Sequence, residues 1–297
     1  MSEIAEIAAG AASTFGEGVE ECWMEIDGAR MRYLRAGAGP PLILLHGLLG
    51  YSFSWRYTLP ALAPYATVYA PDLLGAGFSD RPRGIDHSMR GTALRVLKFA
   101  ENLKIGPFDL LGTSRGGAVA MAAAAQGGGA RGSSPRVRRL VLVCPVNPYS
   151  PHGTWLAPFF GTDLGATLFR VASERMSFLF PYLHGRLYGD QSKIPAGSLE
   201  GYKAPLAIPG LFEHALSIVR TWTADLRELE ALLPKLETMP TLLMWASKDP
   251  AVNASSMEPL ARHFSKVQRV VFPGVGHLPY EECPAEFNRA LIEFIGA

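Results

Sequence analysis

Short apolar runs alternate with stretches of helical periodicity along most of the chain. Several runs are too short for ordinary helices and are typical of strands covered on both faces of a sheet: PLILLHG, ATVYAPD, FDLLGTS, VRRLVLVCP and TLLMWASKD. Two earlier stretches, CWMEID and MRYLRAG, flank Gly28 as the strands of a hairpin would. Helical periodicity between the runs predicts helices over Met89–Leu103, Gly117–Gln126, Met257–Phe264 and Ala285–Phe294. This alternation predicts an α/β fold with a mostly parallel sheet flanked by helices.

The segment from Asn147 to Pro234 interrupts the alternation. It contains no convincing buried strand, and its helix-like pieces are rich in aromatic residues: Trp155, Phe159, Phe160, Phe169, Phe178, Phe180, Tyr182, Tyr188, Phe212 and Trp222. Prolines mark its entry at Pro145 and Pro148 and its exit at Pro234 and Pro240, because proline stops both helices and strands. We predict a helical insertion whose aromatic side chains serve mostly in packing.

A single serine stands between glycines where one apolar run meets a helical stretch. The run that ends at Leu111 leads into GTSRGG, which has the G-x-S-x-G pattern in its strand–turn–helix context. A sharp turn at a strained serine leaves no room for a Cβ at Gly112 or Gly116, and the turn exposes the Oγ of Ser114. The pattern alone also fits a serine that only caps the helix, so the partners of Ser114 decide between the two.

A serine hydroxyl becomes a good nucleophile when a base removes its proton and an acid orients that base. Asp249 follows a predicted strand in TLLMWASKDP, and His277 lies in the glycine-flanked loop VVFPGVGHLPY. Each alone fits an ordinary residue, an Asp-Pro turn or a loop histidine. Both come after Ser114, in the order serine, acid, histidine that this type of nucleophile turn has. Together they predict a triad in which Ser114 attacks, His277 transfers the proton and Asp249 holds the imidazolium.

The negative charge of a tetrahedral intermediate needs hydrogen-bond donors near the serine. LILLHGLLG ends a predicted strand at His46 and Gly47. We expect the main-chain N–H of Leu48, the next residue, to pair with that of Arg115 as an oxyanion hole. His46 is interpreted as a structural histidine that holds this loop, because His277 already supplies the base.

Two charged residues near these motifs are given structural roles. Asp72, in PDLLGAGFSD, comes before Ser114 and is followed by a turn-rich stretch, so we interpret it as a loop-fixing residue rather than the acid of the triad. The side chain of Arg115 is expected to form a salt bridge with a nearby carboxylate.

Several stretches together resemble the α/β-hydrolase superfamily, in its capped branch of esterases, epoxide hydrolases and haloalkane dehalogenases: HGLLGYSFSWR, PDLLGAGFSD, GTSRGG, WASKDP and GVGHLPYEECPAEF. The resemblance covers about residues 21–146 and 238–297. It implies that Ser114, Asp249 and His277 are the triad, and that the insertion is a cap over the active site. We thus predict a core of residues 1–146 and 238–297 and a helical cap of residues 147–237. The cap matches no family pattern, so the resemblance implies no particular substrate.

Differences from related families reduce the number of reactions that this triad is expected to catalyse. Epoxide hydrolases and haloalkane dehalogenases have an aspartate nucleophile where this chain has Ser114, and hydroxynitrile lyases have a lysine where this chain has Leu278. Carbon–carbon bond hydrolases usually have a Gly-Pro-rich loop after His-Gly, which HGLLGYSF lacks. We predict a carboxylic-ester hydrolase. An acyltransferase, thioesterase or perhydrolase could use the same triad, and a ligand receptor could keep the triad with negligible turnover.

Composition and charge favour a small-molecule partner. The chain has 297 residues, of which 48% are hydrophobic, and its 28 Lys and Arg against 27 Asp and Glu leave a net charge of +1. No overall field would attract nucleic acid or an anionic membrane. Few acidic groups accompany the aromatic residues of the insertion, so the expected substrate is an apolar ester. We find no dinucleotide or Walker pattern and no metal-ligand cluster, so no cofactor and no metal are implied.

The cysteines and the N-terminus indicate a cytoplasmic protein. Cys22, Cys144 and Cys283 are odd in number and far apart, which argues against a disulfide framework or zinc site and favours buried thiols. The N-terminus carries Glu3 and Glu6 rather than a signal peptide, and no apolar run approaches the about 18 residues of a membrane span. Nothing in the sequence indicates the oligomeric state.

Overall fold

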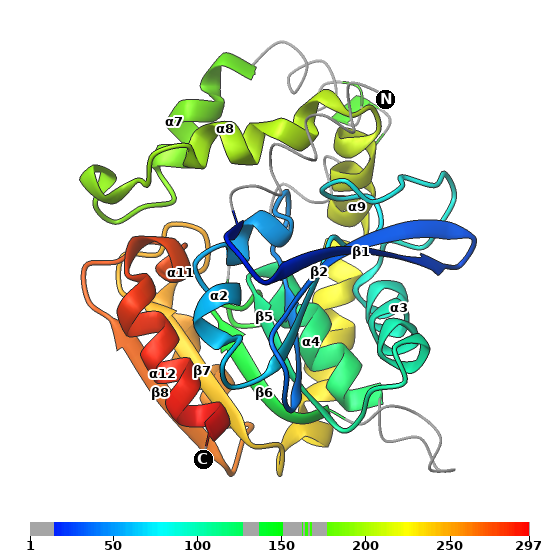
Figure 1. Ribbon diagram of the computed structural model, residues 1–297. Helices are drawn as coiled ribbons and strands as arrows, with labels where there is room; N and C mark the ends of the chain where they lie inside the picture. Colours follow the sequence, from blue (N-terminus) through cyan, green and yellow to red (C-terminus); the bar gives the residue numbers. More distant parts are fainter. Residues whose placement is uncertain are drawn as a thin grey trace.

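The computed structural model describes residues 15–126, 137–150 and 177–296, together with residues 162, 164, 165 and 167. Its centre is an eight-stranded sheet with the order β1-β2-β4-β3-β5-β6-β7-β8 (Figure 1). The strands are β1 (Val19–Ile26), β2 (Ala29–Ala36), β3 (Pro41–Leu45), β4 (Thr67–Pro71), β5 (Phe108–Thr113), β6 (Val137–Val143), β7 (Thr241–Ala246) and β8 (Val267–Phe272). Strands β1 and β2 pair in antiparallel fashion, β2 joins β4 antiparallel, and every pair from β4 to β8 is parallel. The predicted α/β fold is therefore confirmed.

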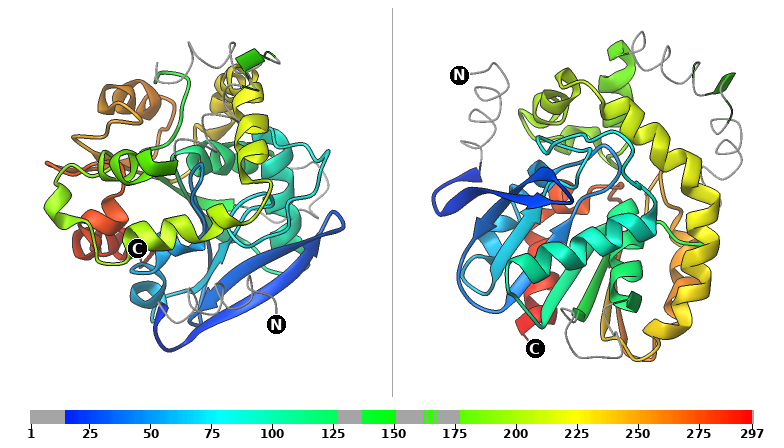
Figure 2. Two further views of the ribbon diagram at one scale, coloured as in Figure 1. Left: turned by 90° about the horizontal axis from the view of Figure 1, so that it is seen from above. Right: turned by 90° about the vertical axis from the view of Figure 1, so that its right-hand side faces the viewer.

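Helices cover both faces of the sheet, which explains why its central strands are continuous apolar runs. On one face, α3 (Met89–Asn102), α4 (Arg115–Gln126) and part of α9 (Leu211–Leu232) pack together. On the other face lie α2 (Leu59–Leu62), α11 (Pro279–Glu282) and α12 (Pro284–Gly296), as Figure 2 shows from two further sides. All residues of β5 and β7 are buried between these layers.

The sequence pattern missed one strand and misplaced some helix ends. Strand β8 was not predicted because it is the edge strand of the described sheet, beside β7, and carries exposed polar residues such as Gln268 and Arg269. Helix α4 begins at Arg115, before the predicted start, and α10 (Met257–Ala261) ends before Phe264. Element boundaries depend on caps and tertiary contacts that periodicity does not record.

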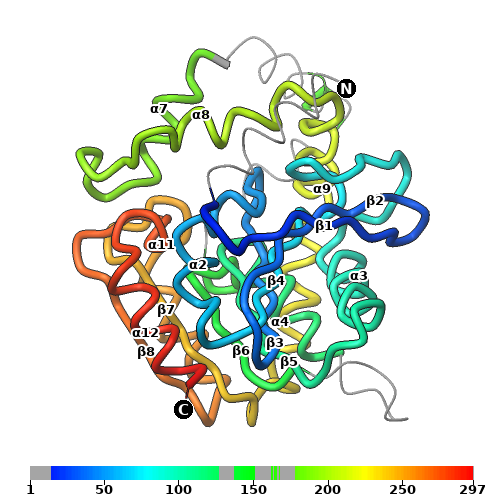
Figure 3. The backbone as a smooth tube through the Cα atoms, viewed as in Figure 1, coloured from blue at the N-terminus to red at the C-terminus, as the bar shows by residue number. Residues whose placement is uncertain are grey.

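Between β6 and β7 the described residues form helices and no strand. These are η3 (Ser177–Leu179), α7 (Phe180–Gly185), η4 (Gln191–Lys193), α8 (Ser198–Lys203), η5 (Ala204–Ala207), α9 and η6 (Leu233–Leu236). In Figure 3, α7 and α8 lie above the sheet, whereas α9 runs from this upper layer down beside α4. The C-terminal part of the insertion therefore also belongs to the layer of helices that covers the sheet.

The aromatic residues of the insertion differ in burial. Tyr188 and Tyr202 are buried, whereas Phe178 and Tyr182 are 72% and 60% exposed and are exceptions to the predicted role in packing. Trp155, Phe159, Phe160 and Phe169 lie outside the described residues.

The cysteines are free thiols in different environments. Cys144 is buried, as predicted, but Cys22 and Cys283 are only half-buried, which corrects the expectation for these two. Cys22 lies on β1, an edge strand, and Cys283 lies at the junction of α11 and α12. In the part of the chain that the structure describes, no helix has the length and apolar character needed to cross a membrane. Glu3 and Glu6 lie outside the described residues.

Candidate active site

Ser114 occupies the turn between β5, which ends at Thr113, and α4, which begins at Arg115. Its φ is 52°, a left-handed value that an L-residue adopts only when its surroundings impose it. Hydrogen bonds within the turn hold Ser114 in this conformation. The N–H of Ser114 donates to the carbonyl of Val143 (3.0 Å), and the carbonyl of Ser114 accepts from the N–H groups of Gly117 (3.0 Å) and Val146 (2.9 Å).

The glycines of the turn are sterically required. A Cβ on Gly112 would lie 2.2 Å from the carbonyl oxygen of Gly116, and a Cβ on Gly116 would lie 2.5 Å from the carbonyl oxygens of Leu45 and His46. These contacts are with backbone, which does not move aside as a flexible side chain would. The G-x-S-x-G pattern thus brings the end of β3 and the start of α4 against the serine.

His277 and Asp249 form a buried hydrogen-bonded pair. Nδ1 of His277 lies 2.8 Å from Oδ2 of Asp249. The other carboxylate oxygen accepts from the N–H groups of Ala251 (2.7 Å) and Val252 (2.9 Å). Burial alone would raise the pKa of Asp249, but the imidazole and these main-chain donors outweigh it and hold that pKa below its usual value. The carboxylate therefore stays ionised and keeps the proton of the neutral imidazole on Nδ1, which leaves Nε2 free to act as a base.

Ser114 and His277 line the same cavity, which has a volume of about 400 Å³. Within the described residues, no hydrogen bond joins the serine hydroxyl to the imidazole. In structures without substrate such a contact is often long and shortens only when substrate binds. The structure thus brings the predicted nucleophile and base to one space, with the predicted acid behind the base.

The predicted oxyanion loop lies beside Ser114. A Cβ on Gly47 would lie 3.0 Å from Cβ of Ser114, so the loop backbone approaches the serine closely. Leu48 lines the same cavity. In the described turns and loops, neither the N–H of Leu48 nor that of Arg115 makes a backbone hydrogen bond. Both donors are therefore available to a bound oxygen atom.

His46 holds this loop in the way its structural interpretation requires. Its Nε2 accepts from the N–H of Leu73 (3.0 Å), so the proton of the neutral ring is on Nδ1, which donates to the carbonyl of Gly47 (2.8 Å). Burial lowers the pKa of His46, which favours this neutral form. Both ring nitrogens are used, so His46 links the oxyanion loop to the residue after Asp72.

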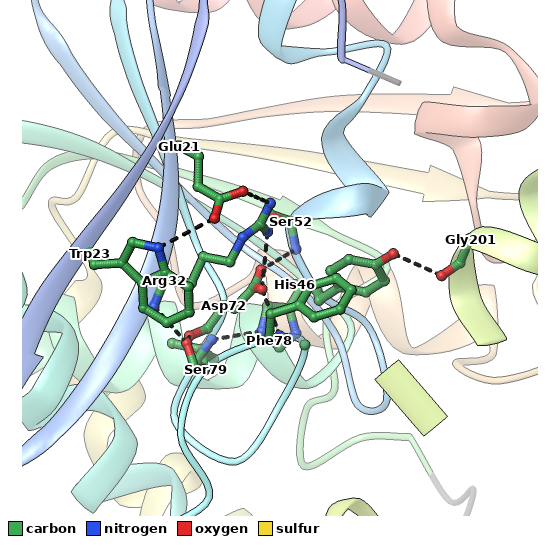
Figure 4. A network of polar contacts seen from close by, with 12 residues as sticks. Glu21, Trp23, Arg32, His46, Ser52, Asp72, Phe78, Ser79 and Gly201 are labelled. Carbon is green, nitrogen blue, oxygen red and sulfur yellow. Dashed lines mark hydrogen bonds and ion pairs between the residues drawn. The ribbon is translucent and has the colours of Figure 1, made fainter. Parts of the chain in front are cut away.

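Asp72 fixes the loop that follows β4 (Figure 4). Its carboxylate accepts from the N–H groups of Ser52 (2.8 Å) and Phe78 (3.0 Å) and pairs with the guanidinium of Arg32 (3.3 Å). The side chains of Asp72 and Arg32 are both fully buried. This contact set agrees with the loop-fixing interpretation.

Among the residues that the structure describes, the expected salt bridge of Arg115 does not form. Its guanidinium donates to the carbonyl of His87 (2.6 Å) and to the hydroxyl of Thr92 (3.3 Å). Burial lowers the pKa of Arg115 to about 10. The expectation was wrong because Arg115, at the start of α4, is buried. Its guanidinium meets neutral oxygen atoms there rather than a carboxylate.

Sequence reasoning missed two buried glutamates that follow the histidine. Glu281 pairs with Arg56 through two contacts of 2.9 and 2.7 Å. Glu282 accepts from the N–H of Gly276 (2.8 Å), next to His277, and from the N–H groups of Gly189 and Asp190 (both 2.9 Å) in the insertion. These contacts join segments far apart in the chain, so a motif search along the sequence gives no signal for them.

Cys144, Asp249 and His277 place three atoms that could bind a metal within 4.8 Å of one another. Burial raises the pKa of the Cys144 thiol well above its usual value. Asp249 and His277 are already bonded to each other. The chemistry of this group is that of an acid and a base and does not suit a metal ion.

Comparisons with known proteins identify the family of this chain. The sequence pattern of the alpha/beta hydrolase fold matches residues 40–284. The chain is 28% identical over 282 residues to haloalkane dehalogenase 2 of Mycobacterium tuberculosis, which covers 93% of this chain and 95% of that protein. It is 27% identical over 274 residues to the 2-hydroxymuconate semialdehyde hydrolase of Pseudomonas sp., over 90% and 91% of the two chains. The crystal structure of Cfl2 from Burkholderia cenocepacia matches with a TM-score of 0.78 and 25% identity, over 94% of this chain and 96% of that one.

The matched residues include the turn at Ser114, the strand end at Asp249 and the loop of His277. Both sequence relatives named above are hydrolases. The sequence pattern, the strand order and the solved structures lead to one conclusion: the chain belongs to the α/β-hydrolase family.

Proposed function

We propose that this protein is a serine hydrolase that cleaves carboxylic esters through an acyl-enzyme. The observation that carries the proposal is the shared cavity, into which a strained Ser114 and the Asp249-bound His277 both open. A nucleophile, its base and an orienting acid are the minimum set for acyl transfer.

The reaction then follows from the roles of the residues. Nε2 of His277 takes the proton of Ser114 while Oγ attacks the ester carbonyl carbon. The N–H groups of Leu48 and Arg115 stabilise the oxyanion, and Asp249 stabilises the imidazolium. The imidazolium gives its proton to the leaving alcohol, and water activated by the same imidazole attacks the acyl-enzyme to release the acid.

The identity of the nucleophile favours esters over the substrates of the dehalogenase relative. Attack of Ser114 on an alkyl halide or an epoxide would leave an ether on its Oγ. An ether has no carbonyl that water could attack, so the enzyme would stop after one alkylation. Attack on an ester gives an acyl-enzyme, which retains a carbonyl that the oxyanion hole can activate for hydrolysis.

We also propose that residues 147–237 form a cap over the site, on a core of residues 1–146 and 238–297. Phe180, Leu183, His184, Arg186, Leu187 and Tyr202 of this segment line the cavity that contains Ser114. The core contributes mainly apolar groups such as Leu49, Pro250 and Leu278. A cavity of this size with mostly apolar walls suits a small ester with an apolar acyl or aryl group.

Sustained turnover distinguishes this enzyme from a receptor that keeps the same residues. With an activated aryl ester in large excess over protein, we expect steady release of the phenol through many turnovers, because His277 can also activate the deacylating water. Release of one equivalent followed by a plateau, for esters of several acyl lengths, would instead indicate a receptor. An added alcohol or thiol that diverts most of the acyl group from water would favour an acyltransferase.

The activity should depend on pH through the protonation state that the base needs. We expect kcat/KM to rise with pH, because only a neutral imidazole accepts the proton of Ser114. The lowered pKa of Asp249 means that its carboxylate, and the stability it contributes, are lost only when the pH falls below the ordinary aspartate range. Burial lowers the pKa of His46 and of His184, which favours their neutral forms. A kcat/KM that does not rise with pH, with circular dichroism unchanged, would contradict the role of the imidazole as the base.

A further inference from the structure

A buried carboxylate organises the polar side chains that join the insertion to the core. The side chains of Arg56 and Glu281 are 2% and 0% exposed. The same carboxylate accepts from the hydroxyls of Tyr188 (2.6 Å) and Ser198 (3.0 Å) and closely from that of Tyr202. A carboxylate paired with a guanidinium can only accept, so Tyr188 donates its hydrogen to Glu281. Ser198 lies 3.0 Å from both that carboxylate and the hydroxyl of Tyr188, so its own hydrogen is directed to this pair of oxygen atoms.

This assignment determines the tautomer of a second histidine in the cavity. Nε2 of His184 lies 3.2 Å from the hydroxyl oxygen of Ser198, whose single hydrogen is directed to the carboxylate of Glu281 and the tyrosine hydroxyl beside it. Nε2 must therefore be the donor of this bond and carry the ring proton. Burial lowers the pKa of His184 despite the nearby charge of Glu281, so the ring is neutral and its Nδ1 holds a lone pair.

The position of His184 in the cavity makes the lone pair of Nδ1 available to a bound molecule. His184 is buried, it lines the cavity that contains Ser114, and its ring lies parallel to that of Phe180, with ring centroids 6.2 Å apart. Within the described residues, Nδ1 makes no hydrogen bond, because the contact with Ser198 uses the other nitrogen. In the part of the chain that the structure describes, Nδ1 is not among the fully buried atoms that lack a partner, so it is open to the cavity, where a donor on a bound molecule can form the hydrogen bond that the protein does not supply.

We propose that Nδ1 of His184 is a specificity-determining acceptor, and that the preferred substrate is a small ester that carries a hydroxyl or N–H group away from its scissile carbonyl. The inference rests on the proposed ester hydrolysis and adds a polar requirement to an otherwise mostly apolar cavity. Donors in the same lining, such as the guanidinium of Arg186, cannot serve a substrate donor. Substrates that place an ether oxygen at this position face an acceptor and are disfavoured.

Pairs of esters that differ only in a hydroxyl or a methoxy group measure the contribution of one donated hydrogen bond. The probes are aryl esters of ω-hydroxyhexanoic acid and ω-methoxyhexanoic acid, and hexanoate esters of hydroxymethylphenol and methoxymethylphenol. The two pairs place the group on the acyl side and on the leaving-group side. We expect the natural protein to prefer the hydroxyl ester about tenfold in kcat/KM in one pair, the effect of one buried hydrogen bond.

Variants assign that preference to His184. The ratio within a pair should fall to about one in His184→Phe and recover in part in His184→Asn, whose side-chain oxygen can replace Nδ1 as acceptor. His263→Phe is the matched control, because His263 is outside the cavity lining, and it should keep the natural ratio. Ratios do not depend on the amount of active protein, so partial misfolding of a variant does not obscure the result.

Binding separates this inference from the proposed function. In the Ser114→Ala protein, dissociation constants for the same ester pairs should show the same preference. If no ester is hydrolysed but the hydroxyl preference appears in binding and disappears in the double variant with His184→Phe, ester hydrolysis is wrong and the acceptor role stands. A natural ratio near one in both pairs, or a ratio that persists in His184→Phe, overturns the role of His184.

Discussion

Replacing Ser114 with alanine is expected to lower ester turnover by roughly 10⁴- to 10⁶-fold in kcat, because no other group supplies the attacking oxygen. The fold should be retained, since alanine removes only a hydroxyl whose oxygen makes no hydrogen bond within the described residues. Steady-state kinetics with an activated aryl ester, together with the thermal unfolding midpoint, test both parts. Full activity in Ser114→Ala would refute the nucleophile.

The other members of the triad should act with Ser114 as one unit. His277→Ala is expected to be as severe as Ser114→Ala, and the double variant should cost little more, because either change alone abolishes the same step. Asp249→Asn should also be severe, since an amide cannot hold the imidazolium in the same way. Asp72→Asn is the control for the acid. If it impaired the chemistry more than Asp249→Asn while stability stayed unaltered, the acid would be misassigned.

The second large effect concerns stability. Arg56→Met leaves Glu281 as a buried carboxylate without its cation, and Glu281→Gln leaves the guanidinium without its anion. Each change should lower the free energy of unfolding by roughly 3–5 kcal/mol, the usual effect of breaking a buried ion pair. Chemical denaturation measures this effect. Glu286→Gln, an exposed change on α12, is the matched control and should shift the free energy by less than about 0.5 kcal/mol.

A double-mutant cycle shows whether the two side chains act through each other. The combined Arg56→Met and Glu281→Gln variant should be less destabilised than the sum of the single changes, because neither buried charge then remains unpaired. Additive losses would mean that the pair contributes little beyond its separate contacts. Single losses below about 1 kcal/mol would contradict the importance of the buried pair.

The nucleophile turn could be predicted because its requirements are local. Gly112, Ser114 and Gly116 are close in sequence, and the steric need for small residues at a sharp strand-to-helix turn leaves a pattern that is readable without coordinates. The central strands were predictable for a similar reason, since burial on both faces requires continuous apolar runs. Strand β8 was missed because an edge strand with polar positions lacks that signal.

The sequence by itself therefore determined the fold class and nominated the nucleophile, acid and base, because turn sterics, strand burial and chain order are all properties of short segments. Only the tertiary structure decided which distant groups meet. Asp249 contacts His277, and Glu281 forms an ion pair with Arg56. The guanidinium of Arg115 donates to a carbonyl instead of forming an ion pair with a carboxylate. The tautomer of His184 depends on the pair of Glu281 and Arg56. Such contacts arise when separate segments pack together, and their free energy depends on burial that no local pattern specifies.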